Sequence, residues 1–230
     1  MIMRLFRNLF LQTSLLTVVL TSLSLASVQA ATGRTKLFDG HSTTAWRGYG
    51  TNSFPSDCWV VERGVLRTVP GHEHDLITRE QYRDFELELE WRVAVGANSG
   101  IMYHVTEEFP ETYFTGPEMQ IVDDDNSDDG KNPLTAAGSL YDLVAPRNKK
   151  LNPAGKWNRA RIVVKGHHVE HWLNGAKIVE YELGSPDLNA MIAKTKFKDW
   201  PRFAKTETGY IALQNHGGEV SFRKIRVRRL

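Results

Sequence analysis

Polar side chains that could perform acid–base chemistry recur in two neighbouring stretches, residues 98–104 and 115–123. Both stretches alternate apolar and polar residues, which is the pattern of a strand with one buried and one open face. The open faces would carry a carboxylate, two carboxamides and an imidazole, from Glu118, Gln120, Asn98 and His104. Such groups can transfer protons and hydrogen-bond hydroxyl groups, so the two stretches predict a polar site on one sheet.

Glu90 is a further candidate because of its predicted position across a hairpin. Residues 84–92 alternate between inward apolar side chains and outward glutamates, which indicates a strand with one solvated face. A glycine-containing turn follows, and folding the chain about Val95 would place Arg92 opposite Asn98 and Glu90 opposite Gly100. We therefore expect Glu90 to join the polar face, while the two preceding glutamates remain ordinary solvated residues.

The elements that must position these residues are mostly short strands. Hydrophobic alternation and turn residues recur roughly every ten residues, and only residues 186–198 place apolar side chains near helical spacing. This pattern predicts an all-β sandwich of antiparallel sheets with one short helix near residues 186–198. No repeat or long linker divides residues 31–230, so we expect a single domain there.

Residues 1–30 have the features of a secretory signal peptide. Two arginines precede an apolar run, and Val28-Gln29-Ala30 offers small residues for cleavage. The run is short and contains several polar residues, which disfavours a membrane anchor. A lipoprotein anchor is disfavoured because no cysteine lies near the cleavage site. We therefore expect a periplasmic or secreted protein that has no membrane partner after cleavage.

Charge and cysteine content restrict the partners and the covalent structure of the chain. Once Arg4 and Arg7 leave with the predicted signal, the remaining chain has equal numbers of basic and acidic residues. Nucleic acid and anionic membranes are therefore poor partners. The single cysteine, Cys58, cannot form an internal disulfide, and its apolar neighbours predict a buried thiol.

Two segments resemble metal sites without completing one. His72 and His74 form a His-x-His pair, but no third ligand stands at a fixed spacing. The acidic segment 123–130 has alternate Asp and Asn oxygens before a glycine, yet it lacks the glutamate that completes an EF-hand loop. We expect no cofactor; a divalent metal is the open alternative, with Asp123 either its ligand or a structural anchor of the loop.

An ordered set of short motifs spans nearly all of residues 35–230. The motifs are Leu37-Phe-Asp-Gly40, Glu90-Trp-Arg92, Asn98-Ser-Gly100, Gly116-Pro-Glu-Met-Gln120, Asp123, Gly138-Ser-Leu-Tyr141, Trp157-Asn158, His171-Trp-Leu-Asn-Gly175 and Leu213-Gln-Asn-His216. In this order they resemble the 3-keto-disaccharide hydrolase family. The resemblance implies a concanavalin A-like jelly-roll sandwich, secreted or periplasmic, whose partner is a carbohydrate. It further implies action on glycosides that carry a ketone at C3 of the sugar.

The chemistry implied by this resemblance can be argued from the ketone. The ketone at C3 acidifies the C2 proton because the resulting carbanion is delocalised as an enolate. A base can remove that proton, the C1 leaving group departs by elimination, and water addition completes net hydrolysis. Such a site needs a base, donors for the enolate oxygen and an acid near the glycosidic oxygen.

The predicted site residues fit these roles by chemical type. Glu118, His104 and His171 are the candidate catalytic residues, the histidines because they are neutral at working pH and Glu118 if burial raises its pKa. The candidate substrate-binding residues are Glu90, Asn98, Gln120, Tyr141, Gln214 and His216. Among these, Tyr141 could also assist the leaving group. Each histidine could instead be a structural residue of its strand.

Other functions remain open on the same fold. A non-catalytic carbohydrate-binding module needs amides and aromatic residues but no clustered base, and jelly rolls carry lectins as readily as enzymes. A conventional retaining glucanase needs two carboxylates about 5–5.5 Å apart. The run Glu86-x-Glu88-x-Glu90 has no aspartate between two glutamates, which is the pattern typical of that chemistry, and this disfavours a glucanase.

Overall fold

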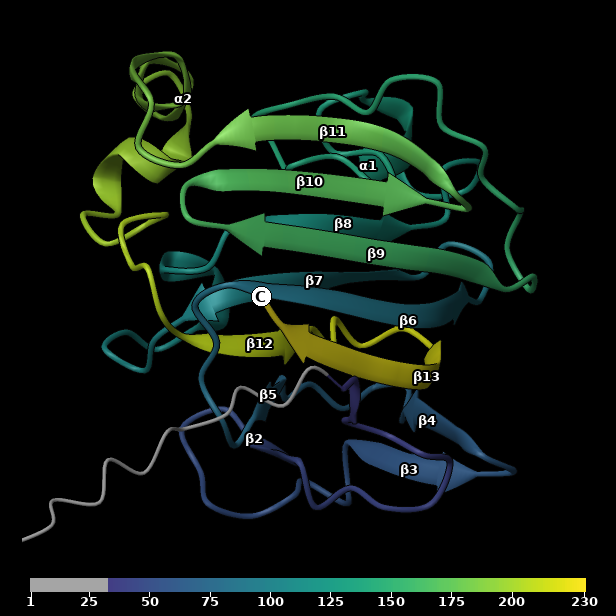
Figure 1. Cartoon of the computed structure of the whole chain (residues 1–230). Coiled ribbons are helices and arrows are strands. Elements are labelled where there is room, and N and C mark those ends of the chain that lie inside the picture. Colours follow the sequence, from purple (N-terminus) through teal and green to yellow (C-terminus); the bar gives the residue numbers. More distant parts are fainter. Residues whose placement is uncertain (1–32) are drawn as a thin grey trace, which may run out of the picture. The chain divides into compact units, whose positions relative to one another are not determined.

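The computed structural model describes residues 33–230, so the predicted signal peptide lies outside the described residues. Residues 33–230 belong to one compact unit. Their strands build two antiparallel sheets with few helices (Figure 1), which confirms the predicted all-β sandwich. Within residues 33–230, no helix has the length and apolar character needed to cross a membrane.

The larger sheet contains eight strands: β1 (Thr35–Lys36), β3 (Trp59–Glu62), β4 (Val65–Thr68), β6 (Phe85–Val93), β9 (Asn158–Lys165), β10 (His168–Leu173), β11 (Ala176–Glu182) and β13 (Val220–Arg229). They lie in the order β11-β10-β9-β6-β13-β4-β3, and β1 pairs with β13. Consecutive strands β9, β10 and β11 form an antiparallel meander, as their glycine-containing turns predict.

The smaller sheet contains five strands: β2 (Trp46–Gly48), β5 (Leu76–Thr78), β7 (Asn98–Val105), β8 (Glu118–Val122) and β12 (Tyr210–Leu213). They lie in the order β2-β5-β12-β7-β8. In the β7–β8 pair, Gly100 lies opposite Gln120 and Met102 lies opposite Glu118. The two polar stretches of the sequence are therefore neighbouring strands of one sheet.

The core lies between the two sheets because each sheet directs alternate residues inward. On β6, Phe85, Leu87, Leu89 and Trp91 are each at most 2% exposed. Across from them, alternate residues of the smaller sheet join the same apolar cluster. Full burial of each such side chain contributes about 1.5–3 kcal/mol, so this alternation dominates the stability of the sandwich.

The connection after β6 differs from the predicted hairpin. β6 pairs with β9 and β13, whereas β7 pairs with β8 and β12, so the chain crosses from one sheet to the other between Val93 and Asn98. Both strands bury alternate apolar residues in one core. Strands in two facing sheets can do so as well as strands paired in a hairpin, so the alternation did not distinguish the two arrangements. The prediction that Glu90 lies opposite Gly100 in a hairpin is therefore wrong.

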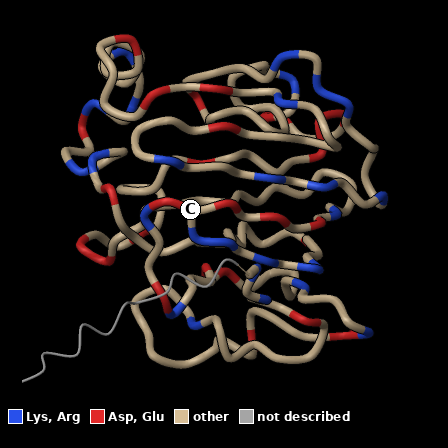
Figure 2. Tube along the Cα trace, in the orientation of Figure 1, with Lys and Arg blue, Asp and Glu red and all other residues tan. Residues whose placement is uncertain are grey.

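The outer face of the larger sheet is charged, and Figure 2 shows acidic and basic residues alternating over its strands. The glutamates of β6 pair with arginines of the adjacent strands: Glu86 with Arg228 at 3.0 Å, Glu88 with Arg159 at 2.9 Å and Glu90 with Arg223 at 2.6 Å. Part-exposed pairs of this kind each contribute little to stability. Glu90 thus belongs to a paired, solvated face.

Helical segments are short and lie in the connections. They are η1 (Thr112–Phe114), α1 (Asp128–Lys131), α2 (Pro186–Ile192) and η2 (Lys196–Asp199), where η denotes a 3-10 helix. The predicted helix over residues 186–198 is divided into α2 and η2. Ser185 caps α2 by accepting a hydrogen bond from the Leu188 N–H at 3.1 Å.

Candidate functional site

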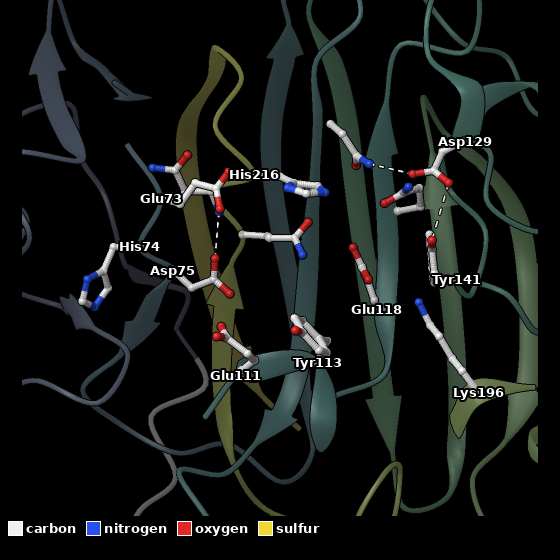
Figure 3. A pocket seen from close by; sticks show the side chains of 14 residues that line it. Glu73, His74, Asp75, Glu111, Tyr113, Glu118, Asp129, Tyr141, Lys196 and His216 are labelled. Carbon is white, nitrogen blue, oxygen red and sulfur yellow. Dashed lines mark hydrogen bonds between the residues drawn. The ribbon is translucent and has the colours of Figure 1, made fainter. Parts of the chain in front are cut away.

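A polar cavity of about 490 Å³ lies on the face of the smaller sheet that points away from the core (Figure 3). Six of the predicted site residues line it: Asn98, Glu118, Gln120, Tyr141, Gln214 and His216. The other lining residues are Glu73, His74, Asp75, Glu111, Tyr113, Asp129, Lys196 and Asn215. Strands β7 and β8 supply the floor, and loops that are far apart in the sequence supply the walls.

Glu118 is the buried acid at the floor of the cavity. Glu118 is only 9% exposed to solvent. Burial, followed by the negative charge of Asp75, raises the pKa of Glu118 to about 8, while the charge of Lys196 opposes this rise. Glu118 can therefore exchange a proton near neutral pH, which is a property of catalytic acids and bases.

Gly100 provides the space in which the Glu118 carboxylate lies. The two residues belong to paired strands: Met102 lies opposite Glu118, and Gly100 lies two residues before Met102 on the same face of β7. A Cβ atom at Gly100 would overlap Oε1 of Glu118. The missing side chain therefore lets the carboxylate lie across the backbone of β7.

Gln120 and Asn98 present polar atoms that lack partners. Gln120 is 1% exposed, yet neither Oε1 nor Nε2 has a hydrogen-bond partner within residues 33–230. Asn98 donates from Nδ2 to Asp129 at 2.8 Å, and its Oδ1 is likewise unpartnered in that range. An unpaired buried polar group costs roughly 1–3 kcal/mol. The floor of the cavity is thus ready to hydrogen-bond a polar ligand.

Tyr141, Asp129 and Lys196 form one wall of the cavity (Figure 3). The Tyr141 hydroxyl donates to Oδ1 of Asp129 at 3.5 Å, and Nζ of Lys196 lies 4.8 Å from the centre of the Tyr141 ring. Burial and the charge of Asp129 raise the pKa of Tyr141, so its hydroxyl keeps its proton. This wall offers an ammonium group and a hydroxyl donor.

Asp75 lies on the wall across from Lys196, together with Glu73 and Glu111 (Figure 3). Its carboxylate accepts hydrogen bonds from Thr112 Oγ1 at 2.5 Å and from the Asn215 N–H at 2.8 Å. Burial raises the pKa of Asp75 to about 6, against the effect of these two bonds. This wall is therefore acidic.

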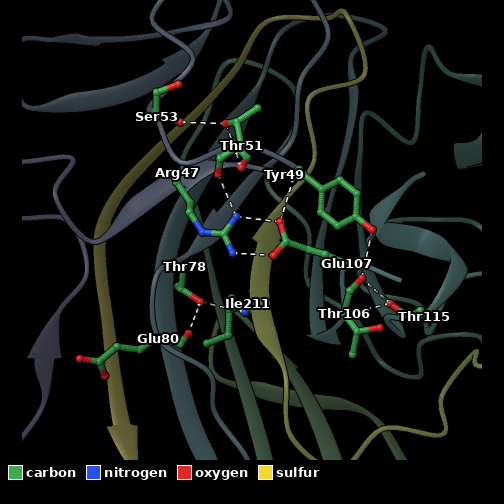
Figure 4. Close-up of polar contacts among 12 residues, drawn as sticks. Arg47, Tyr49, Thr51, Ser53, Thr78, Glu80, Thr106, Glu107, Thr115 and Ile211 are labelled. Carbon is green, nitrogen blue, oxygen red and sulfur yellow. Dashed lines mark hydrogen bonds and ion pairs between the residues drawn. The ribbon is translucent and has the colours of Figure 1, made fainter. Parts of the chain in front are cut away.

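The loop over residues 106–115, which carries two of the lining residues, is held by contacts with the start of the domain (Figure 4). Arg47 donates to both carboxylate oxygens of Glu107, each at 2.7 Å. Tyr49 donates its hydroxyl to the Phe109 carbonyl at 2.5 Å. A two-bond arginine–carboxylate pair fixes orientation as well as distance, so the loop presents its side chains to the cavity in one arrangement.

His104 does not lie in the cavity, which corrects its predicted strand face. β7 carries one extra residue opposite β12, and His104 has a positive φ of 54° at this bulge. Val105 therefore joins Met102 on the outer face of the sheet. His104 is 2% exposed, and its Nε2 hydrogen-bonds the carbonyl of Arg83 at 2.9 Å.

His171 also lies outside the cavity, because it belongs to the core between the sheets. It is fully buried. Its Nε2 bonds the hydroxyl of Tyr103 at 2.9 Å and its Nδ1 bonds the Gly138 carbonyl at 3.2 Å. Burial lowers the pKa of His171 to about 4. The structure thus assigns this histidine a structural hydrogen-bonding position.

The predicted metal ligands also have other partners. Asp123 accepts hydrogen bonds from the Gly96 N–H and from Asn126, both at 2.8 Å, and does not line the cavity. It therefore anchors its loop, as one of the two predicted roles requires. His74 lies at the edge of the cavity, where its Nε2 bonds the Tyr49 carbonyl at 2.9 Å.

Sequence reasoning missed most of the walls. Asp75 and Glu111 stand in loops whose sequences have no periodicity, Lys196 begins the short helix η2, and no motif marks any of the three as a site residue. Asp75 directly precedes a strand that enters the site sheet, which is the one signal that could have identified it. The buried thiol of Cys58, in contrast, was predicted from its apolar neighbours and is 5% exposed.

Known proteins resemble this chain over nearly its whole described length. A family model described as a 3-keto-alpha-glucoside-1,2-lyase-like domain matches residues 33–228. A curated 3-keto-disaccharide hydrolase from Bacteroides thetaiotaomicron is 33% identical over 229 residues, covering 86% of this chain and 79% of that protein. A solved candidate glycosyl hydrolase from Parabacteroides distasonis is 32% identical with a TM-score of 0.80, covering 86% of this chain and 94% of that one.

A more distant solved structure shares the fold alone. A carbohydrate-binding module from Bacillus subtilis is 8% identical with a TM-score of 0.50, covering 80% of this chain and 95% of that module. Such a likeness supports the lectin-like sandwich and carries no information about activity.

Proposed function

The chain belongs to the family of 3-keto-alpha-glucoside-1,2-lyase-like domains, which makes it a glycoside-cleaving enzyme, and we propose that it acts on 3-keto-glycosides by elimination across C1 and C2. The observation that carries this mechanism is Glu118, a buried carboxylate with a raised pKa among unpartnered amides. A binding module has no use for a buried base, so this carboxylate favours the enzyme over the non-catalytic alternative.

Glu118 is the proposed base. Its ionised carboxylate removes the C2 proton, and the electron pair of the C2–H bond forms the enolate with the C3 ketone. The raised pKa makes the ionised form a stronger base than an ordinary glutamate, since proton affinity and pKa rise together. Burial and the charge of Asp75 supply this rise.

Lys196 and Tyr141 are the proposed donors for the enolate oxygen. The ammonium group of Lys196 and the protonated hydroxyl of Tyr141 lie on one wall of the cavity, where both face a bound ligand (Figure 3). A fixed cation and a hydrogen bond stabilise the negative charge that develops on the ketone oxygen. This assignment places Tyr141 at the ketone, whereas its residue type alone suggested the leaving group.

The leaving group departs from C1 toward the Asp75 wall. Cleavage of the C1–O bond converts the enolate to an enone, and the carboxylic acid of Glu118 returns the proton to the departing oxygen. Water then adds across C1 and C2, so that the sum is hydrolysis. Gln120 and Asn98 hydrogen-bond the sugar hydroxyls, which satisfies amide atoms that otherwise have no partner among the described residues.

The proposed steps move only protons and electron pairs between substrate, water and this chain. We therefore propose that no metal or other cofactor takes part, and that Asp123 acts on its loop alone. Treatment with a chelator followed by exchange into metal-free buffer is expected to leave turnover unchanged. Loss of turnover that added divalent metal restores would reject this part of the proposal.

The test of the function uses matched oxidised and unoxidised glycosides. The protein is expected to release product from a 3-keto-glucoside and none from the corresponding glucoside. Deuterium at C2 should slow the reaction, and deuterium from heavy water should appear at C2 of the product. Equal binding of both glycosides with no product would support the binding module, and product without exchange at C2 would reject the elimination route.

We also propose that residues 1–30 direct export, so that the mature protein begins at Ala31. Two features support this proposal: an apolar run that is interrupted by polar residues, and small residues before the predicted cleavage site. Sequencing the N-terminus of the protein recovered from the periplasm or medium of a bacterial host is the test. Recovery of the intact N-terminus in the cytoplasm would reject it.

A further inference from the structure

The two walls of the cavity carry unequal charge. Lys196 lies on one wall, and among the described lining residues no other lysine or arginine occurs. The facing wall holds Glu73, Asp75 and Glu111 (Figure 3). Asp129 shares the wall of Lys196, so that wall carries one charge of each sign, whereas the facing wall carries three carboxylates and no lysine or arginine.

Asp75 holds a fixed position on the acidic wall. Asp75 is held by Thr112 and Asn215, and the charge of Glu111 contributes to the rise of the Asp75 pKa, so these carboxylates lie close enough to interact. Glu73 packs against Gly217, where a Cβ atom would lie 2.8 Å from its Oε1. The Asp75 carboxylate is thus held in place, with the exposed side chains of Glu73 and Glu111 on the same wall.

Two other features indicate that a ligand occupies this space. Gln120, 1% exposed, directs an unpartnered amide oxygen and nitrogen at the cavity. Tyr113 also lines the cavity, and its ring packs on Phe114 at 5.1 Å and on Trp200 at 5.5 Å. A supported aromatic ring beside polar groups is suited to hold a sugar or an aryl aglycone.

We propose that the wall of Glu73, Asp75 and Glu111 is the subsite for the leaving group, and that it favours amine-bearing leaving groups over neutral ones and neutral ones over those that carry a carboxylate. The proposal rests on the proposed function, because Glu118 at C2 and Lys196 at the C3 oxygen direct C1 toward this wall. Amino sugars and amine-bearing aglycones are the matching chemical class.

The size of the effect follows from Coulomb's law. One charge about 7 Å from a carboxylate in partly buried surroundings changes binding on the order of tenfold, and less at high salt. Two exposed carboxylates, Glu73 and Glu111, can be neutralised without touching the proposed base. The charge preference is therefore measurable and separable from the chemistry.

The experiment compares 3-keto-glucosides of three phenols that differ only beyond a methylene group: 4-(aminomethyl)phenol, 4-(hydroxymethyl)phenol and 4-(carboxymethyl)phenol. The methylene keeps the acidity of the three leaving groups similar. At pH 7 and low salt, kcat/KM is expected to fall in that order, by about tenfold per step. Added salt should reduce the differences.

Variants identify the wall as the cause. In the double variant Glu73→Gln with Glu111→Gln, the three kcat/KM values are expected to converge to within about threefold. The control is Glu207→Gln, which removes the charge of an exposed glutamate that pairs with Arg83 outside the cavity lining. It should leave the order and the spacing of the three substrates unchanged.

The results separate this proposal from the proposed function. Equal kcat/KM for the three substrates, or a charge preference that survives in the double variant, overturns the subsite. If none of the three is cleaved, the proposed function fails. The subsite is then tested by calorimetry with the three unoxidised glucosides, whose affinities should fall in the same order: amine, hydroxyl, carboxylate. Absence of binding, or binding without charge preference, then overturns it.

Discussion

Gly100 and Glu118 share one volume of space on neighbouring strands. The carboxylate of Glu118 lies where a Cβ atom of residue 100 would be, and only glycine leaves that volume empty. This contact fixes the proposed base across β7, at the floor of the cavity. It also links a residue without a side chain to the chemistry of the site.

Gly100→Ala is expected to lower kcat/KM by at least about 100-fold, because the added methyl group displaces the carboxylate from its position over β7. The backbone at Gly100 is not in the left-handed region, so alanine causes no conformational strain of its own. Steady-state kinetics on a 3-keto-glucoside measure the effect, and thermal unfolding checks the fold.

A double-mutant comparison makes this prediction specific. If the methyl group acts by moving the carboxylate, Gly100→Ala should have little further effect on activity once Glu118 is glutamine. A loss that adds fully to that of Glu118→Gln would show that Gly100 matters for another reason.

The rate should depend on pH through Glu118. Its ionised form is the base, and its pKa is raised to about 8, so kcat/KM is expected to rise with pH and level off above 8. At pH 6 it should be roughly 100-fold below the plateau, since the ionised fraction falls tenfold per pH unit. A rate that is flat from pH 6 to pH 9 would contradict the assignment.

The same raised pKa predicts a stability effect of opposite sign to that of most acids. Between about pH 4.5 and pH 8 the folded protein holds the Glu118 proton more tightly than the unfolded chain does, so its free energy of unfolding falls as pH rises through this window. Glu118→Gln should remove this loss. At pH 8 we expect the variant to melt at least about 5 °C above the natural protein, while its kcat/KM falls roughly 1000-fold. A lower melting temperature would contradict the burial argument.

Lys196→Met should lower kcat by about 100-fold, because the enolate oxygen loses its cation. It should also move the pH inflection upward, since Lys196 opposes the rise of the Glu118 pKa. Asp75→Asn is expected to move the inflection downward for the reverse reason. Lys198→Met, on the same 3-10 helix but outside the cavity lining, is the matched control. An unshifted inflection in both Lys196 and Asp75 variants would refute this account.

Part of this site could be predicted from sequence because part of it is periodic. Alternation along β7 and β8 predicts which side chains share a face, and Asn98, Glu118 and Gln120 do share it. Most of the walls could not be predicted, because a residue such as Lys196, at the start of η2, reaches the cavity only through tertiary contacts that no local pattern records. The same holds for the crossing between sheets after Val93.

A single inserted residue explains why the strand face of His104 was predicted wrongly. Alternation assumes an unbroken strand, and the bulge at His104 shifts the phase by one residue. His104 has a positive φ although it is not a glycine, and nothing in the neighbouring sequence indicates such a backbone. Bulges depend on the partner strand, which lies more than 100 residues further along the chain in β12.

His171 provides the last test, since it separates a structural histidine from a catalytic one. His171→Phe removes the hydrogen bonds to the Gly138 carbonyl and to Tyr103, which keeps its bond to Tyr181, and this should cost about 1–3 kcal/mol of stability and lower Tm by roughly 2–10 °C. Well below that Tm, kcat/KM should stay within about threefold of the natural protein.

The variant should also lose an acid sensitivity: the pKa of His171 is lowered to about 4, so its burial costs stability as pH falls from about 6.5 toward 4. The surface residue His168, on the same strand, is the control, and His168→Gln should change stability by less than about 1 kcal/mol. A large loss of kcat/KM at unchanged Tm in His171→Phe would return His171 to the catalytic residues.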